Sequence, residues 1–202
     1  MRWRALTALV ASLALITAPA AADPSSAALQ SYSAGDYLSA ASSAEAEGSP
    51  AALVFAARSL MAACMTMPHQ RDVGAWLDRA ERASEAALRL DPNSVAARLQ
   101  LAFTLGAKGR RASLAQAITY NYAPRGRHLI QEAITRAPDN AEAHALLGAW
   151  HLEVLRRGGA TGARFYGARL DTGIAEFERA RALAPNDELI AIQFGIALLQ
   201  LD

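Results

Sequence analysis

The chain has 202 residues, 49 of them alanine, with 52% hydrophobic residues, 6% aromatic residues and a single cysteine. This length allows one compact domain or two very small ones, and the composition excludes disordered, collagen-like and disulfide-rich chains. Abundant alanine with leucine, glutamate and arginine favours helix over strand. The formal net charge of +1 gives no electrostatic reason to expect the chain as a whole to bind nucleic acid.

Residues 1–22 have the order of a secretory signal peptide. Two arginines lie within the first four residues, a short apolar run follows, and Ala20 and Ala22 are small residues at the −3 and −1 positions of a cleavage site. We predict cleavage after Ala22, which makes residues 23–202 a periplasmic or secreted protein. A mitochondrial targeting peptide is the alternative, although its arginines would be spread along the segment.

Neither the apolar stretches nor the net charge of the mature chain favours a membrane or a nucleic acid as its partner. No further apolar stretch approaches the ~20 residues that an integral membrane span needs. Removing two of the 20 basic residues with the signal peptide leaves 18 against 19 acidic residues, a net charge of −1. We therefore expect neither an integral span nor a nucleic-acid partner.

A repeat runs through the mature chain, marked by Pro92, Pro138 and Pro185, which lie 46 and 47 residues apart. An amphipathic segment precedes each proline, with small, bulky and small residues at positions i, i+4 and i+7. These triplets are Ala80, Ser84 and Ala87; Gly126, Ile130 and Ala133; and Gly173, Phe177 and Ala180. Such a stripe predicts a helix that packs closely against a neighbour and ends at the proline.

A second amphipathic segment follows each proline. Its inward positions at i, i+3, i+4 and i+7 are Arg98, Leu101, Ala102 and Leu105; His144, Leu147, Gly148 and His151; and Ala191, Phe194, Gly195 and Leu198. The third position is always small, which allows the backbone of a partner helix to come close. The chain is therefore predicted to repeat a helix–turn–helix unit.

These residues resemble the tetratricopeptide-repeat (TPR) family. The small–bulky–small stripe with a proline five residues later is similar to that family's second-helix signature, and Leu147-Gly148 is similar to its first-helix pair. Ala34–Tyr37 looks like the start of a further second helix, so the resemblance covers about residues 28–202. It implies an all-α fold, a right-handed TPR-like superhelix of stacked helical hairpins.

The repeat period departs from the family, because TPR units run about 34 residues. The surplus lies in two inserts, Gly109–Arg125 and Arg156–Thr172. We predict a short inserted helix in each repeat, with tyrosines such as Tyr120 covering the hairpin and the arginines facing water. A HEAT-like repeat, whose period lies in this range, is the alternative.

One stretch resembles a particular branch of TPR proteins, the regulator-of-microtubule-dynamics family and its bacterial relatives. The residues concerned are Gly148–His151, Arg157–Ala160 and Tyr166–Ala168. The resemblance implies a shared architecture. A role at microtubules does not carry over to a chain with a bacterial type of export signal.

The last segment, Glu188–Asp202, has the pattern of a first helix with no second helix after it. Its apolar residues are too many for a solvated capping helix. A truncated product, a face that docks on a partner, and a terminal helix that shields the end of the stack all remain open.

The sequence favours a non-catalytic protein without a cofactor. It has no HExxH zinc motif, no phosphate-binding loop and no Gly-x-Ser-x-Gly motif. The alternative is a copper-handling protein that uses the soft ligands between Met61 and His69, namely Met61, Cys64, Met65, Met67 and His69. Packing is the favoured interpretation of this cluster, because Leu60 and Cys64 continue an apolar helical stripe.

The repeat favours binding of a protein or peptide partner as the function, because first-helix residues of stacked hairpins line a concave groove. The groove candidates are Arg98, Asn93, Asn140 and His144. Trp150 and Tyr166 are candidate aromatic anchors, and Arg156 and Arg157 are candidates for contacting an acidic partner or anionic lipid. Packing of Trp150 beneath the insert is the alternative for that residue.

Overall fold

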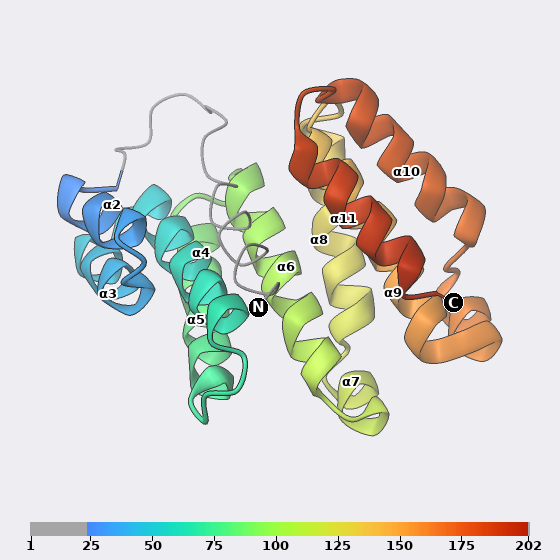
Figure 1. Ribbon diagram of the computed structural model, residues 1–202, viewed down its shortest axis with the longest axis horizontal. Helices are drawn as coiled ribbons and strands as arrows, with labels where there is room; N and C mark the ends of the chain where they lie inside the picture. The colour runs from blue at the N-terminus through green and yellow to red at the C-terminus, as the bar shows by residue number, and fades with distance from the viewer. Residues whose placement is uncertain (1–23, 202) are drawn as a thin grey trace, which may run out of the picture. The chain divides into compact units, whose positions relative to one another are not determined.

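The computed structural model describes residues 24–201, which form α-helices and contain no strand (Figure 1). The helices are α2 (Ser26–Ser33), α3 (Tyr37–Glu47), α4 (Pro50–Thr66), α5 (Val73–Leu90), α6 (Val95–Arg111), α7 (Leu114–Thr119), α8 (Tyr122–Arg136), α9 (Ala141–Tyr166), α10 (Leu170–Leu183) and α11 (Glu188–Leu199). Consecutive helices pack against one another from α2 to α5 in the first unit and from α7 to α11 in the second. The predicted all-α fold of helical hairpins is confirmed.

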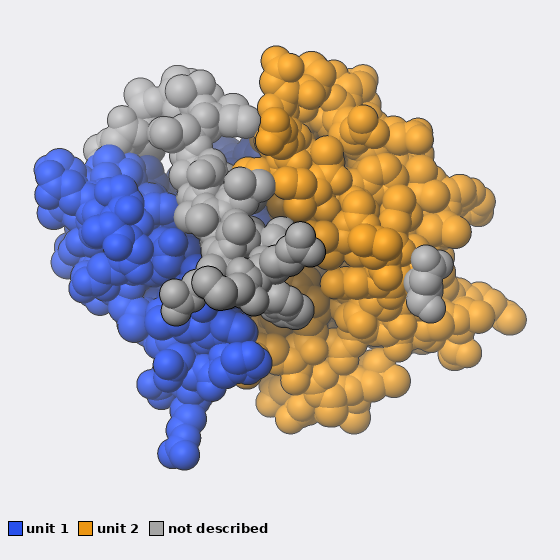
Figure 2. All heavy atoms as spheres, viewed as in Figure 1, with its two compact units in different colours: residues 1–104 blue, residues 105–202 orange. Residues whose placement is uncertain are grey.

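The chain divides into two compact units, residues 1–104 and 105–202 (Figure 2). The predicted signal peptide and its cleavage after Ala22 lie outside the described residues. Within the described part, none of the helices has both the length and the apolar character needed to cross a membrane.

The predicted repeat boundaries are confirmed. Helices α5, α8 and α10 each end two residues before Pro92, Pro138 and Pro185. The following helices begin at side-chain caps, where oxygens of Ser94, Asn140 and Asp187 accept backbone N–H groups of the first helical turn. The donors are Ala97, Ala143, Leu189 and Ile190. Such caps satisfy donors that a helix start otherwise leaves unpaired.

In the first unit, α4 is the central helix and packs against α3 and α5. Its core is built from small side chains around Leu60, which is fully buried together with Ala56, Ala57 and Ala63. Facing alanines of α3 are also fully buried, which allows the helix backbones to approach closely. Gly48, with φ 69°, ends α3 and lets α4 start at once behind Ser49.

In the second unit, α9 and α10 meet at a glycine. A Cβ atom added to Gly148 would lie 2.6 Å from Phe177 Cδ2 and 2.8 Å from the carbonyl oxygen of Gly173. Phe177 is fully buried and stacks on Phe194 of α11, with 4.8 Å between the ring centroids. The predicted close approach at the small third position is therefore confirmed for this hairpin.

Both inserts contain a short helix, as predicted. The first is α7, which begins with a capping box between Ser113 and Gln116. In the second, α9 is interrupted at Gly159 (φ 54°, ψ −157°), so the turns that follow, up to Tyr166, form a separate short segment that ends at Gly167. The expected covering role of Tyr120 is wrong, because this side chain is 57% exposed and contacts the ring of Tyr122.

Candidate partner-binding surfaces

Arg98 and His144 occupy the same repeat position and contact the equivalent backbone group. The Arg98 guanidinium donates to the carbonyl oxygens of Ser94 and Pro92, and His144 Nε2 lies 2.8 Å from the carbonyl oxygen of Pro138. His144 Nδ1 lies 2.6 Å from Glu176 Oε2. Both side chains are buried, and the structure places them in the turn after each proline rather than on an open groove.

Asn140 and Trp150 are also engaged within the second unit. The Asn140 side chain accepts the backbone N–H of Ala143 at 2.8 Å and so caps α9. Trp150 Nε1 donates to the carbonyl oxygen of Ala123 at 2.8 Å, and the guanidinium of Arg127 lies 5.1 Å from the centroid of its ring. The half-buried indole packs against the second insert. This agrees with the alternative given by the sequence, in which Trp150 packs beneath the insert.

Tyr166 and Arg127 join the second insert to α8. Arg127 Nη1 donates to the backbone carbonyl of Tyr166 at 2.9 Å, while the half-buried Tyr166 ring belongs to the apolar cluster around Val154, Ala163 and Ala168. The neighbouring Phe165 is 78% exposed. The sequence-predicted aromatic anchors therefore lie together, and they hold the insert in place.

Arg156 and Arg157 differ in their surroundings. Arg156 is exposed and pairs with Glu153 at 2.7 Å. Arg157 crosses to the first insert, where it donates to the carbonyl oxygens of Gly109 and Ala112, the latter at 2.9 Å. The prediction that both arginines face water is wrong for Arg157, because this side chain finds backbone acceptors at the end of α6.

Replacing Arg157 with alanine is expected to lower the free energy of unfolding by about 1.5–3 kcal/mol. The substitution removes a charged donor, so the carbonyl oxygens of Gly109 and Ala112 lose their hydrogen bonds to it. The matched variant Arg156→Ala loses only a surface ion pair, and a change below about 1 kcal/mol is expected. Chemical denaturation measures both, and limited proteolysis should show new cleavage between residues 109 and 121 in Arg157→Ala alone. Equal effects of the two variants would refute the assigned contact.

His151 lies at the junction of α9 and α10. It is buried, and its Nδ1 accepts the backbone N–H of Arg169 at 3.1 Å. Burial and the nearby Arg127 lower the pKa of the imidazole, which keeps the ring in the neutral form that can accept this bond. The ring therefore caps the start of α10.

The soft ligands between Met61 and His69 are separated in the structure. Met61 and Cys64 are buried, and the Cys64 thiol faces the carbonyl oxygen of Val73 at 3.9 Å, whereas Met65 and His69 are exposed. Within the described part of the chain, no three or more His, Cys, Asp or Glu side chains gather as a metal site would require. Packing accounts for the two buried members of this cluster.

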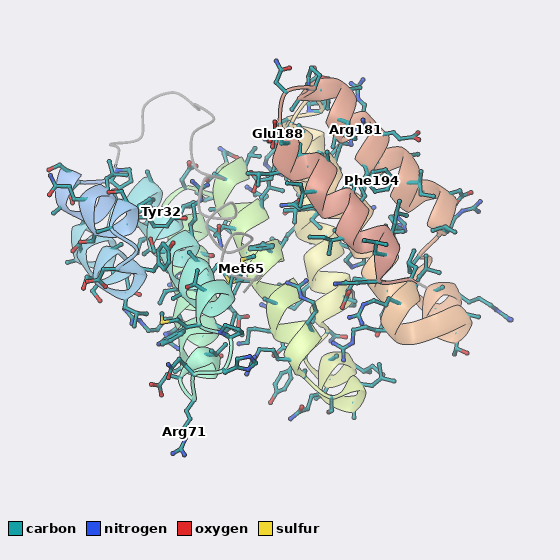
Figure 3. All side chains as sticks on the ribbon, viewed as in Figure 1. Tyr32, Met65, Arg71, Arg181, Glu188 and Phe194 are labelled. Atoms are coloured by element: carbon teal, nitrogen blue, oxygen red, sulfur yellow. The ribbon has the colours of Figure 1, made fainter. Side chains whose placement is uncertain are left out.

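One side of α11 is apolar and largely exposed, and we call its residues the α11 face: Ala191, Ile192, Gly195, Ile196 and Leu199. The opposite side of the helix packs on α9 and α10 through Ile190 and Phe194, the latter labelled in Figure 3. On the open side, Leu199 is 76% exposed and Ile196 is 46% exposed. A Cβ atom added to Gly195 would meet nothing within 4 Å, whereas Phe177 occupies the space beside the equivalent residue Gly148.

A second surface, which sequence reasoning missed, lies in the first unit. A shallow groove of about 460 Å³ runs along α3, α4 and α5, and we call it the α3–α5 groove. Its lining residues are Glu45, Leu53, Arg79, Arg82, Ala83, Ala86 and Arg89. The available sequence signal was the one-sided spacing of the three arginines on α5.

The comparisons with known proteins concern the fold. No family model matches the sequence, and no curated protein matches it. Among solved structures, the chain is similar to the crystal structure of a thermophilic TPR protein from Thermus thermophilus, with 20% sequence identity and a TM-score of 0.49, covering 85% of this chain and 95% of that chain. At this level of identity the similarity says nothing about a ligand.

Proposed function

We propose that the protein is an exported, non-catalytic helical-repeat scaffold that binds a partner protein in the periplasm or outside the cell. Export rests on the signal-peptide order of residues 1–22. A relation to bacterial members of the regulator-of-microtubule-dynamics branch is part of the proposal. It is supported by the sequence resemblance of Gly148–His151, Arg157–Ala160 and Tyr166–Ala168.

The observation that carries the binding function is the α11 face. Exposed leucine and isoleucine side chains on one surface are unfavourable in water and mark interaction sites when they are contiguous. From Leu189 to Leu201 the sequence contains no charged residue, so no charged side chain in this stretch opposes burial. The opposite side of α11 belongs to the apolar cluster that joins α9, α10 and α11.

The preceding hairpin indicates what kind of partner fits. There, the small residue Gly148 lies against Gly173 and Phe177 of α10, whose buried stripe also includes Ala180. Gly195 occupies the equivalent position on α11 and has an open surface before it. The partner that fits this position is therefore an amphipathic helix with small, bulky and small residues at i, i+4 and i+7.

Several buried polar side chains support a non-catalytic role, because their hydrogen bonds serve the fold. Ser59, Ser84 and Thr104 donate to carbonyl oxygens one turn earlier in their own helices. The buried histidines hold a turn and a helix start, as described above.

A photo-crosslinking residue at position 199, in cells that naturally make the protein, tests the proposed function. The expected result is one discrete adduct, whose cross-linked peptide maps to an amphipathic helix with the small–bulky–small stripe. The same crosslinker at position 165 is the control, because Phe165 and Leu199 are 78% and 76% exposed in the same unit. An identical adduct pattern at both positions would contradict a specific α11 face.

A further inference from the structure

The α3–α5 groove combines an apolar floor with a basic rim. Leu53 of α4 and Ala83 and Ala86 of α5 line it together with charged side chains at its edge. Because α3, α4 and α5 all belong to the first unit, the groove shares no residue with the α11 face. Any ligand here is therefore a second one, beyond the proposed function.

The charge of the groove is positive although the mature chain is close to neutral. Three arginines and one glutamate line it, and Arg79 is paired with Glu45 at 2.7 Å. Arg82 and Arg89 are exposed, and neither forms an ion pair with another residue of the described part of the chain. Two guanidinium groups therefore remain for an anionic ligand.

The spacing of these two arginines indicates the form of the ligand. Arg82 and Arg89 lie seven residues apart on α5, a rise of roughly 10 Å along the helix. A peptide in the extended polyproline II conformation advances about 3.1 Å per residue and has three residues per turn, so side chains three residues apart lie on the same side of the peptide, separated by roughly 9 Å. Each guanidinium can then form a bidentate pair with one carboxylate, while small apolar residues between them contact Ala86.

We propose that the α3–α5 groove binds an extended acidic peptide segment that carries two carboxylates three residues apart. Charge complementarity selects the acidic side chains, and the apolar floor favours a peptide over a free inorganic anion. Arg79, held by Glu45, positions the groove wall and contributes less to the ligand.

The test is a fluorescence-anisotropy titration of the purified protein with a labelled synthetic peptide, Ala-Glu-Ala-Ala-Glu-Ala. The expected result is saturable binding that Arg82→Gln and Arg89→Gln each weaken about tenfold, or about 1.4 kcal/mol. Arg82→Lys keeps the charge but loses the planar guanidinium that can form two hydrogen bonds to one carboxylate, so an intermediate loss of affinity is expected. The control is Arg71→Gln, since Arg71 is exposed and extends away from the helices of the first unit, outside the groove lining (Figure 3); thermal melts confirm that the variants fold.

Three outcomes overturn the proposal. Equal weakening by Arg71→Gln would mean that only net charge matters. Equal binding of the Ala-Gln-Ala-Ala-Gln-Ala peptide would remove charge complementarity. Absence of peptide binding, together with Arg82-dependent binding to phosphatidylglycerol vesicles, would assign the surface to a membrane instead. None of these results affects crosslinking at position 199, so this inference and the proposed function fail independently.

Discussion

Replacing Gly148 with alanine is expected to destabilise the protein by about 1–3 kcal/mol, the usual cost of overpacking a close contact. The added Cβ would lie 2.6 Å from Phe177 Cδ2 and 2.8 Å from the Gly173 carbonyl oxygen. The second contact is with backbone, which cannot move aside as a flexible side chain can. The two helices would have to separate, and Phe177 would lose part of its packing.

Gly195→Ala is the matched control, because Gly195 holds the same repeat position on α11 and its Cβ would meet nothing within 4 Å. This variant is expected to stabilise the protein by about 0.5–1 kcal/mol, since alanine is the better helix former. Chemical denaturation followed by circular dichroism measures both variants. If both substitutions changed the free energy of unfolding in the same direction, the assignment of a filled space beside Gly148 and an open space beside Gly195 would be incorrect.

Phe177→Ala is expected to have the largest effect among these substitutions, a loss of about 3–5 kcal/mol. The ring is fully buried, contacts the Gly148 position and stacks on Phe194, so it connects α9, α10 and α11. Phe165→Ala removes the same ring from a position that is 78% exposed, and a change within about 0.5 kcal/mol is expected.

A double-mutant cycle separates loss of packing from a general loss of structure. In the Phe177→Ala background, a Cβ at position 148 enters the space that the ring has left. The additional cost of Gly148→Ala should then shrink markedly, which gives a coupling energy of opposite sign to the single effects. Strict additivity of the two changes would show that Gly148 and Phe177 do not share a contact.

The sequence predicted the hairpins because its strongest signals are local. Proline positions, capping residues and small residues at a fixed helical spacing act within a turn or two, and they placed the helix ends and the contact at Gly148 correctly. The short inserted helices followed from the same kind of evidence.

The direction of long side chains could not be predicted in this way. Arg157 and Arg156 are neighbours with the same chemistry, yet only Arg157 meets the carbonyl groups of the first insert, 45 and 48 residues away in sequence. Arg98 and His144 were expected in a groove and instead hold the turns after Pro92 and Pro138. Which acceptor lies within reach depends on how the helices pack, and periodicity alone does not contain that information.

The candidate surfaces were accessible to sequence reasoning only in part. The apolar character of Glu188–Asp202 was visible in the sequence, but the open position at Gly195 becomes apparent only when it is compared with the filled position at Gly148. The α3–α5 groove needs three helices to be brought together, so the arginines of α5 have no evident meaning before the fold is known.

The adduct yield at position 199 in a Gly195→Trp background tests the central claim most directly. A tryptophan at Gly195 would occupy the position that a partner helix should enter, whereas Gly74→Trp places the same side chain at another exposed helical glycine with nothing within 4 Å. The predicted result is that Gly195→Trp abolishes the adduct and Gly74→Trp preserves it. An unchanged adduct in Gly195→Trp would contradict partner binding through the α11 face.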